Sequence, residues 1–154
     1  MPVLGVIYVP VTGELYVGVA GEGARKAQCP ADQPVDPTAA MAGADILPLP
    51  KGDRPYTAVA SRSHLSPETE AFIEELKQEH GEVVTISKGS SLKLCMVAEG
   101  KADCYPRFAP TMEWDTAAGQ GICMAAGFDV IDQDSGVTMR YNREQLLNAW
   151  FLVR

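Results

Sequence analysis

The residues best suited to chemistry are concentrated in one stretch, residues 89–127, which contains two predicted helix starts. The first is Gly89-Ser90-Ser91, with Lys93 shortly after it, and the second is Trp114-Asp115-Thr116. The first turn of a helix has unpaired backbone N–H groups and a partial positive charge, so both starts favour phosphate or carboxylate ligands. The oxygens of Asp115 could also hold a hard cation. A phosphate and a divalent metal are therefore the pair of ligands that this stretch favours.

These residues also have plainer interpretations. An Asp at a helix start caps the helix more often than it binds a metal, and a Lys one turn into a helix is commonly solvated. Their arrangement is more informative, because the Gly-Ser-Ser-x-x-Lys turn, a Tyr-Pro-Arg-Phe loop at 105–108 and the Trp-Asp start follow one another at the ends of successive elements. Sites in α/β sheets form where elements end on one side. The order of these three segments predicts one shared site.

Length and charge narrow the classes of protein. The chain has 154 residues, which suits one domain, or one domain with a piece of another. Its formal net charge of -7 argues against a nonspecific nucleic-acid binder, which normally shows a basic face. A negatively charged ligand therefore needs positive groups that are concentrated locally.

Cysteine usage and hydropathy predict a cytoplasmic protein. The four cysteines form no Cys-x-x-Cys pair, and the two histidines do not stand at zinc-ligand spacing. We expect reduced, mostly buried thiols rather than disulfides or metal ligands at Cys29, Cys95, Cys104 and Cys123. No segment reaches the about 18 consecutive apolar residues of a membrane span, and no charged and then apolar leader opens the chain.

The N-terminal third is predicted to hold a β-hairpin and a crossover. Residues 3–21 are rich in β-branched and aromatic residues and break at 10–13, which indicates a hairpin, and 21–26 is a candidate for a further strand. Residues 28–55 are dense in proline and predict a surface crossover with a short strand near 46–47. We therefore divide the chain into a hairpin at 1–27, a crossover at 28–55 and an α/β domain at 56–154.

The remaining residues alternate between strand and helix patterns, which is typical of an α/β fold. Ser66 followed by Pro67 and early acids marks a helix start, and His80-Gly81 marks its end. The helix at 114–127 is rich in small residues, which predicts close packing. We expect strands at 56–60, 82–87, 102–105 and 150–153, helices at 66–80, 90–100 and 114–127, a hairpin-like pair at 128–131 and 137–140, and one helical turn at 144–148.

The most specific segments, GSSLKLCMVAEGKADCYPRF and WDTAAGQGI, resemble the metal-dependent phosphatases of the inositol monophosphatase superfamily. The closest branch is that of the 3'(2'),5'-bisphosphate nucleotidases of the CysQ type. The resemblance extends to VLGVIYVPVTGELYVGVAGEGA and SRSH, and so covers nearly the whole chain. It implies the C-terminal α/β part of an alternating α/β sandwich, preceded by a β-hairpin left from the N-terminal α+β part.

The resemblance also implies a site. Family members hydrolyse phosphate monoesters with Mg²⁺, and Asp115 would be the metal ligand from the C-terminal half. Gly89, Ser90 and Lys93 match positions that cradle the nucleotide phosphate. Ser61 and His64 match positions that line the nucleotide, although a plain loop role is equally open for them.

Arg107 helps to decide which substrate class the resemblance favours. The corresponding loop of the inositol phosphatases carries a carboxylate that binds a sugar hydroxyl, whereas a guanidinium suits a second phosphate. The resemblance therefore favours 3'-phosphoadenosine 5'-phosphate over inositol phosphate as the substrate. The alternative is a surface arginine paired with a local acid such as Glu113.

The chain departs from the family in one large respect. Family members carry, before the equivalent of residue 3, a Glu-containing segment and an Asp-Pro-x-Asp-Gly-Thr motif that supply most metal ligands. The one Asp-Pro here, Asp36-Pro37, continues Thr-Ala-Ala and does not fit. We therefore expect a C-terminal portion that by itself has little or no phosphatase activity.

The sequence is also compatible with two other functions. One is a non-catalytic anion-binding or vestigial module, and a weaker one is an inositol- or sugar-phosphate phosphatase. A lone hairpin is only marginally stable, so its exposed edge needs a partner, and we expect a homodimer formed through this edge.

Overall fold

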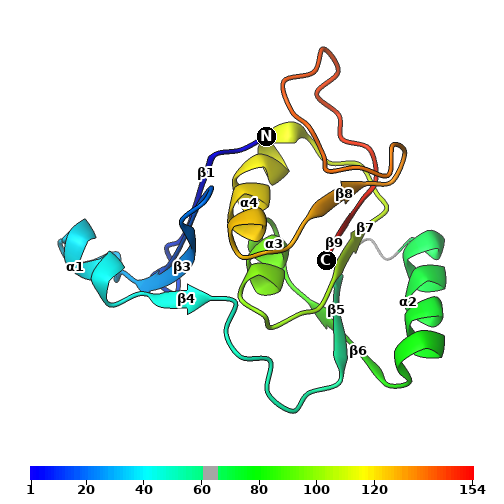
Figure 1. Ribbon diagram of the computed structural model, residues 1–154, viewed down its shortest axis with the longest axis horizontal. Coiled ribbons are helices and arrows are strands. Elements are labelled where there is room, and N and C mark those ends of the chain that lie inside the picture. The colour runs from blue at the N-terminus through cyan, green and yellow to red at the C-terminus, as the bar shows by residue number, and fades with distance from the viewer. Residues whose placement is uncertain (61–65) are drawn as a thin grey trace.

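An antiparallel sheet of four strands begins the chain in the computed structural model, which describes residues 1–60 and 66–154 (Figure 1). Its strand order is β1-β2-β3-β4. The first two strands form the predicted hairpin, and the third fulfils the expectation of a further strand at 21–26. The strands are β1 (Leu4–Val9), β2 (Glu14–Val19), β3 (Gly23–Gln28) and β4 (Asp45–Leu47).

The crossover contains one helix that the sequence pattern did not predict. Helix α1 (Pro37–Ala42) begins after Asp36, whose Oδ1 accepts hydrogen bonds from the N–H groups of Thr38 at 2.9 Å and Ala39 at 3.3 Å. Pro37 occupies the first turn, where its missing N–H is no loss. Asp36-Pro37, which fits no metal motif, therefore serves as a helix start. The predicted strand near 46–47 is confirmed by β4.

A second layer is built from β5 (Tyr56–Ala60), β6 (Val83–Ser87), β7 (Tyr105–Arg107), β8 (Val130–Asp132) and β9 (Phe151–Val153). Strands β5 and β6 are parallel, and β7-β9-β8 form an antiparallel group. An isolated parallel bridge between Ala58 and Cys104 joins the two groups. Helix α2 (Pro67–His80) connects β5 to β6, and it starts as predicted, with the Ser66 hydroxyl accepting from Thr69 N–H at 3.2 Å.

Sheets and helices alternate through the molecule (Figure 1). Helices α3 (Leu92–Ala98) and α4 (Glu113–Ala125) lie between the four-stranded sheet and the second layer, and α2 covers the far side of that layer. The main core fills the space around α3 and α4, with Val97, Ile122 and Phe151 fully buried. A mixed α/β architecture is thereby confirmed. The assignment to the C-terminal half of a sandwich and the three-part division at 27/28 and 55/56 stay predictions.

Small residues let α4 approach the first sheet at backbone distance. A Cβ atom on Gly18 would lie 2.5 Å from Ile122 Cα, and one on Gly121 would lie 3.0 Å from the backbone nitrogen of Gly5. A Cβ on Gly5 would overlap the Ala118 carbonyl oxygen. The small residues of 114–127 therefore serve close packing, as predicted.

A buried ionic cluster fastens the first sheet to the end of α3. Glu99 is 2% exposed, and it accepts hydrogen bonds from Tyr16 Oη at 3.1 Å and Lys26 Nζ at 2.7 Å. Lys26 also pairs with Glu14 at 2.6 Å, and Lys101 pairs with Glu99 at 2.7 Å. Burial opposes the charge of Glu99, but these lysines outweigh it and keep its pKa below the ordinary value.

Several predicted elements differ from the structure. The helix expected at 144–148 is absent from the described fold, where Leu147 instead forms an isolated bridge with Met112. The strand expected at 102–105 is shifted to Tyr105–Arg107, because its register is fixed by pairing with β9. The second arm of the pair expected at 137–140 is reduced to one bridge between Ile131 and Thr138. All four cysteines are buried free thiols, as expected.

Within the described ranges, no helix is both long enough and apolar enough to cross a membrane.

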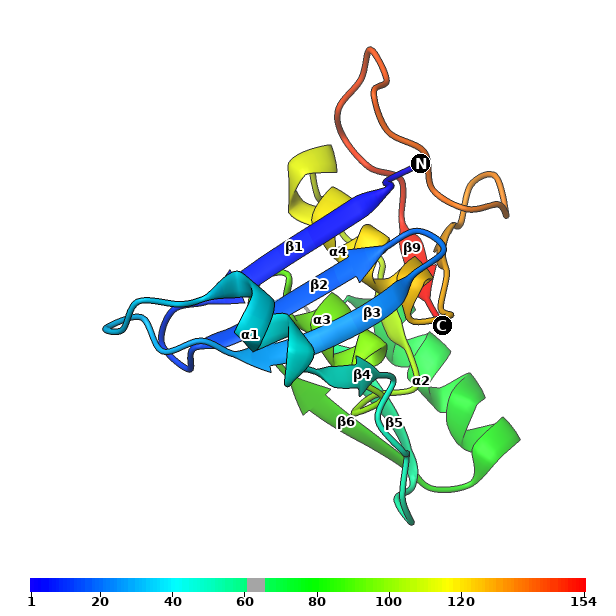
Figure 2. The ribbon, with the colours of Figure 1, turned by 60° about the vertical axis from the view of Figure 1, so that its left-hand side comes forward.

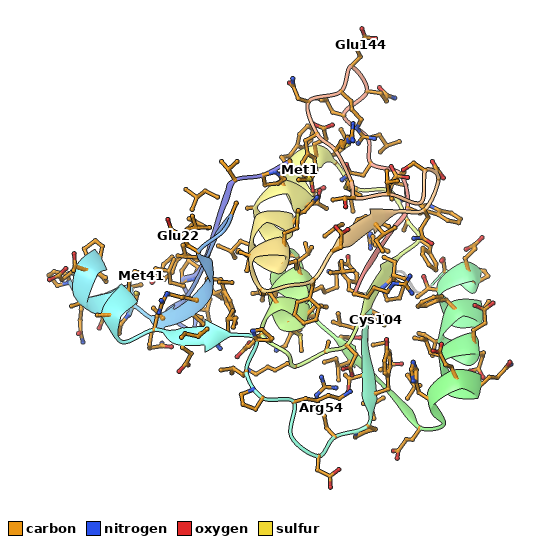
Figure 3. The ribbon with its side chains drawn as sticks, in the orientation of Figure 1. Met1, Glu22, Met41, Arg54, Cys104 and Glu144 are labelled. Atoms are coloured by element: carbon orange, nitrogen blue, oxygen red, sulfur yellow. The ribbon has the colours of Figure 1, made fainter. Side chains whose placement is uncertain are left out.

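Asp103 anchors the crossover to the second layer. Arg54, which lies in the loop between β4 and β5 (Figure 3), donates to Asp103 Oδ2 at 2.5 Å and to Gly100 O at 2.8 Å. Lys51 pairs with Asp103 at 2.8 Å, and Thr57 N–H donates to it at 2.7 Å. Burial would raise the pKa of Asp103, but Arg54, Lys51 and the Thr57 N–H together hold it below the ordinary 3.8.

The variant Asp103→Asn should therefore lose stability at neutral pH, by about 1–3 kcal/mol in the free energy of unfolding. A carboxyl with a depressed folded-state pKa stabilises the fold above its unfolded pKa and loses that contribution as pH falls below it. The gap between wild type and variant in urea denaturation should thus narrow from pH 7 to about pH 3. Asp53→Asn, at an exposed position, is the matched control. A gap that stays constant with pH would contradict this account.

Candidate functional site

A pocket of about 470 Å³ lies where the start of α3, the end of β7 and the start of α4 meet. Strand β1 from the first sheet and β9 from the second layer complete its walls. The three chemistry-bearing segments of the sequence therefore do converge. The lining residues are Ile7, Gly89, Ser90, Ser91, Lys93, Leu94, Tyr105, Arg107, Pro110, Thr111, Trp114, Asp115, Thr116, Ala118, Gly119 and Phe151.

Five of the sequence-predicted site residues line this pocket: Gly89, Ser90, Lys93, Arg107 and Asp115. The other two, Ser61 and His64, lie outside the described residues. The convergence is a geometric result, and the role of each residue stays a prediction.

Lys93 is a buried cation rather than a solvated one. Lys93 is 6% exposed, and its Nζ donates to Ser90 O at 2.9 Å and to Lys88 O at 3.3 Å. The ammonium also lies 5.4 Å from the centre of the Tyr105 ring, where a cation–π attraction operates. Ser90 has a φ of 53° in this turn, which is uncommon for a residue with a side chain. The backbone carbonyl groups at this turn are thus directed at the ammonium of Lys93, which follows the turn in the chain.

Arg107 does not pair with Glu113, so the alternative interpretation of this arginine as one half of that ion pair is wrong. Its Nη2 donates to Pro110 O at 3.0 Å, and its Nε is buried without a hydrogen-bond partner in the described structure. Glu113 pairs with Arg143 instead, at 2.9 Å.

Lys93 and Arg107 create a local excess of positive charge. Neither forms an ion pair within residues 1–60 and 66–154. Burial first, and repulsion from Arg107 second, lower the pKa of Lys93. Burial also raises the pKa of Tyr105 to about 12, so its hydroxyl is neutral at physiological pH. An anion in the pocket would relieve the repulsion between the two cations, so the pocket is suited to a phosphate.

Asp115 is the third residue of α4, and it caps the helix. Its Oδ2 accepts a hydrogen bond from the Met112 N–H at 2.8 Å. It is also the one carboxylate among the described residues that line the pocket. Across the described chain, no group of three or more metal-ligating side chains comes together. A single carboxylate beside two cations is a weak Mg²⁺ site, because Mg²⁺ needs several oxygen ligands. These residues fit an anion, and by themselves they do not make a metal site.

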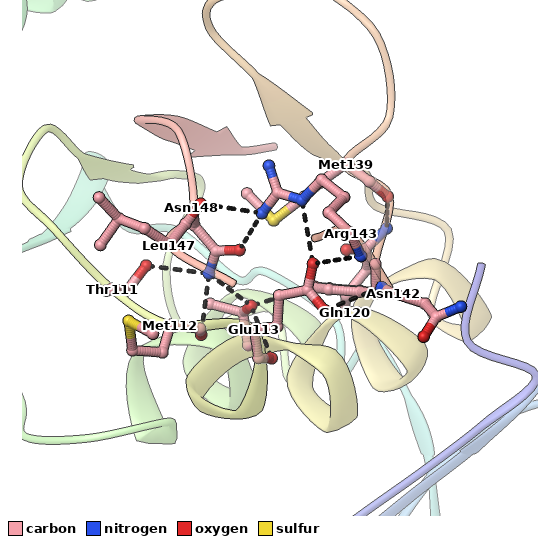
Figure 4. Close-up of polar contacts among 11 residues, drawn as sticks. Thr111, Met112, Glu113, Gln120, Met139, Asn142, Arg143, Leu147 and Asn148 are labelled. Carbon is pink, nitrogen blue, oxygen red and sulfur yellow. Dashed lines mark hydrogen bonds and ion pairs between the residues drawn. The ribbon is translucent and has the colours of Figure 1, made fainter. Parts of the chain in front are cut away.

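A hydrogen-bonded network fixes the start of α4 and thereby Asp115 (Figure 4). Glu113 accepts from the N–H groups of Asn142 at 2.8 Å and Arg143 at 3.3 Å, and from Arg143 Nε at 2.9 Å. Arg143 Nη2 reaches Asn148 Oδ1 at 2.9 Å. Asn148 Nδ2 then donates to Met112 O at 2.9 Å and to Thr116 Oγ1 at 3.1 Å. The segment 141–148 is thus tied to the first turn of α4.

Sequence reasoning missed this network. The sequence suggests Glu113 as a partner for Arg107, and its pattern predicts a helical turn that includes Asn148. The partners stand about thirty residues apart in the chain, and no local pattern connects them. Trp114 was recognised as part of the motif, but its 67% exposure at the pocket rim was not predicted.

A comparison with protein families matches residues 1–151 to the inositol monophosphatase family, so the chain belongs to that family. It is 42% identical over 153 residues to the 3'(2'),5'-bisphosphate nucleotidase CysQ of Salmonella typhimurium, a match that covers 99% of this chain and 54% of the relative. The CysQ of Escherichia coli K12 is 40% identical over the same length and coverage. The chain thus spans about half the length of the curated relatives it matches.

Solved structures agree with the family assignment. The crystal structure of CysQ from Bacteroides thetaiotaomicron superposes on this chain with a TM-score of 0.91 and is 53% identical to it. The match covers 99% of this chain and 58% of that chain. The inositol monophosphatase II of Staphylococcus aureus has a TM-score of 0.63 at 20% identity, which shows a shared fold alone.

Lys93→Met tests the anion pocket directly. Removing a charge-assisted hydrogen bond of about 1.5–3 kcal/mol should weaken binding of inorganic phosphate by roughly tenfold or more. Thermal stability should not fall, because the variant removes a buried cation that Arg107 repels. An NMR titration with phosphate and a thermal melt measure the two effects, and Lys77→Met on the exposed side of α2 is the control. A large loss of stability with unchanged phosphate binding would make Lys93 a structural residue.

Proposed function

We propose that this chain forms part of a Mg²⁺-dependent 3'(2'),5'-bisphosphate nucleotidase. The complete enzyme would remove a phosphate monoester from a substrate such as 3'-phosphoadenosine 5'-phosphate and release AMP and phosphate. The observation that carries the proposal is the presence of two cations, Lys93 and Arg107, without an acidic partner in one pocket of the described structure. Curated relatives that match nearly the whole chain bear this activity in their names, which supports the assignment.

In this proposal, different residues of the pocket would hold each of the two phosphates and the metal. Lys93 and the turn at Gly89 and Ser90 would hold one phosphate, because the ammonium and the first-turn N–H groups are all donors. The planar guanidinium of Arg107 would take the second phosphate through paired hydrogen bonds. Asp115 would contribute one oxygen ligand to Mg²⁺, which when bound activates water and neutralises charge on the phosphoryl group.

Ser61 and His64 stay proposed contacts to the nucleoside part of the substrate. They follow β5, whose residues Tyr56–Ala60 pair in parallel with β6. The turn at Gly89 comes just after β6, and the carboxyl ends of the parallel strands β5 and β6 lie at the same edge, where sites form in α/β sheets.

The second candidate is a module that binds an anion without catalysis. It is favoured by one observation, namely that Asp115 is the one carboxylate on the described pocket wall. An inositol- or sugar-phosphate phosphatase is disfavoured, because Arg107 occupies the loop where a sugar-binding carboxylate is expected.

The isolated chain should bind the substrate but turn it over slowly. With 3'-phosphoadenosine 5'-phosphate and Mg²⁺, phosphate release should stay near the enzyme-free blank, while Salmonella typhimurium CysQ serves as the positive control. Isothermal titration of the same nucleotide should still give a saturable signal, because the two cations are in place. Turnover near that of the control would contradict the expectation that other residues supply most of the metal site.

Arg107→Lys tests the second phosphate. The variant keeps the charge but loses paired hydrogen bonding, so the affinity for 3'-phosphoadenosine 5'-phosphate should fall by roughly tenfold. The affinity for AMP, which lacks the second phosphate, should change much less. Arg140→Lys, at an exposed position, controls for a general effect. Equal losses for both nucleotides would show that Arg107 does not distinguish them.

A further inference from the structure

Asn148 is buried, and both ends of its side-chain amide are hydrogen-bonded. It is 5% exposed, although it belongs to the segment between β8 and β9 that loops out from the body of the molecule, orange to red in Figure 2. Its Oδ1 accepts from Arg143 Nη2 at 2.9 Å. Its Nδ2 reaches three oxygens, namely Thr111 Oγ1 at 3.1 Å, Met112 O at 2.9 Å and Thr116 Oγ1 at 3.1 Å. A buried amide with these partners holds the groups around it in fixed positions.

Arg143 and Glu113 decide which way this amide points. A guanidinium has donors and no acceptor, so the amide turns its oxygen toward Arg143 and its NH₂ group toward the start of α4. Glu113 holds Arg143 in place by accepting from its Nε at 2.9 Å, as Figure 4 shows. The donor end of Asn148 is therefore aimed at residues 111 and 112.

The same C-terminal segment supports the loop 108–112, which connects β7 to α4, at both of its ends. At one end, the Asn148 N–H donates to Thr111 O at 2.8 Å, in addition to the side-chain bonds. At the other end, the ring of Trp150 lies 5.7 Å from the ring of Phe108. Neither Asn148 nor Trp150 is among the described residues that line the pocket. They act on the pocket only through this loop.

The loop carries the carbonyl group that holds Arg107. Arg107 Nη2 donates to Pro110 O at 3.0 Å, and Pro110 directly precedes Thr111. This carbonyl is the one hydrogen-bond partner of the guanidinium within the described part of the chain, where the Arg107 Nε is buried and unpaired. Arg107, Pro110 and Thr111 all line the pocket. The direction of the guanidinium in the pocket thus depends on where the loop places the Pro110 carbonyl.

We propose that Asn148 is a positioning residue that sets the direction of Arg107. It fixes residues 111 and 112, these fix the Pro110 carbonyl, and the carbonyl fixes the guanidinium. Paired hydrogen bonds to a phosphate are directional, and a binding group must be held within about 0.5 Å to form them. Without the Asn148 amide, the charge of Arg107 stays in the pocket but its direction is lost. The effect on a nucleotide with a second phosphate rests on the proposed function.

The first test measures the order of the Arg107 guanidinium without any ligand, by NMR relaxation of its Nε–H group. Asn148→Leu keeps the number and branching of the side-chain atoms, adds no charge and removes both ends of the amide. Arg107 should become much more mobile in this variant than in the wild type. Gln145→Leu, the same kind of change at an exposed position of the same segment, is the control. An Arg107 that stays equally ordered in Asn148→Leu would overturn the proposal.

The second test uses isothermal titration with 3'-phosphoadenosine 5'-phosphate and with AMP. Asn148→Leu should weaken binding of the bisphosphate by up to roughly tenfold, as Arg107→Lys does, and binding of AMP much less. The double variant should bind no more weakly than Arg107→Lys alone, because both changes act through one guanidinium. Additive losses in the double variant would show that Asn148 acts by another route and would overturn the proposal.

The outcomes separate this proposal from the proposed function. If Arg107→Lys distinguishes the two nucleotides and Asn148→Leu does not, Arg107 keeps its proposed role and the positioning role of Asn148 is overturned. If Arg107 becomes mobile in Asn148→Leu but neither variant distinguishes the nucleotides, the positioning role is supported and the assignment of the second phosphate to Arg107 is overturned.

Arg143→Lys keeps the proposal testable if a thermal melt shows that Asn148→Leu does not fold. This variant keeps the charge, but an ammonium lacks the planar fork that reaches Glu113 and Asn148 together. The order of Arg107 and the preference for the bisphosphate should fall in the same direction as in Asn148→Leu, by a smaller factor. Arg140→Lys, at an exposed position, is the control. An unchanged Arg107 in Arg143→Lys would then overturn the proposal.

Discussion

The contact on which the rest of the structure depends is the backbone-to-backbone approach of the first sheet and α4. Gly5 and Gly18 face the small residues of the helix so closely that a methyl group on either would collide with helix backbone. Because the two backbones touch directly, the distance between sheet and helix is fixed. This contact therefore sets the position of β1 over the start of α4. Ile7, two residues beyond Gly5, consequently joins Asp115 in lining one pocket. The Glu99 cluster provides a second attachment of the sheet, to the end of α3.

Much of the fold could be predicted because the signals were local. Ser66 and Pro67 mark the start of α2, and the break at 10–13 marks the hairpin. The site segments were also recognisable, since turns and helix starts are short motifs. What could not be predicted depends on distant partners. The helical pattern at 144–148 is overridden because Asn148 and Leu147 bond to the start of α4, more than thirty residues earlier. Asp36-Pro37 has the residue types of a helix start, but the same pair also resembles the beginning of a metal motif, and the local sequence does not decide between the two.

The pocket is unusual in its electrostatic composition. A buried lysine normally has an acid beside it, because an unpaired buried charge is costly. Lys93 is held instead by two carbonyl groups and an aromatic ring, and its charged neighbour Arg107 makes its burial harder. Dipoles and a ring stabilise the ammonium without neutralising it. The positive field therefore stays available to a ligand, at some cost in the stability of the free protein.

The overall charge of the chain has a consequence for how quickly such a ligand arrives. With a formal net charge of -7, the molecule repels a phosphate ester at long range, and the two cations attract it only when it is close. Added salt shortens the range of that repulsion, to about 8 Å at physiological ionic strength, and weakens the attraction inside the buried pocket much less. Moderate salt should thus speed the capture of an anion, which is the reverse of the behaviour of a protein that steers its ligand with a broad positive surface.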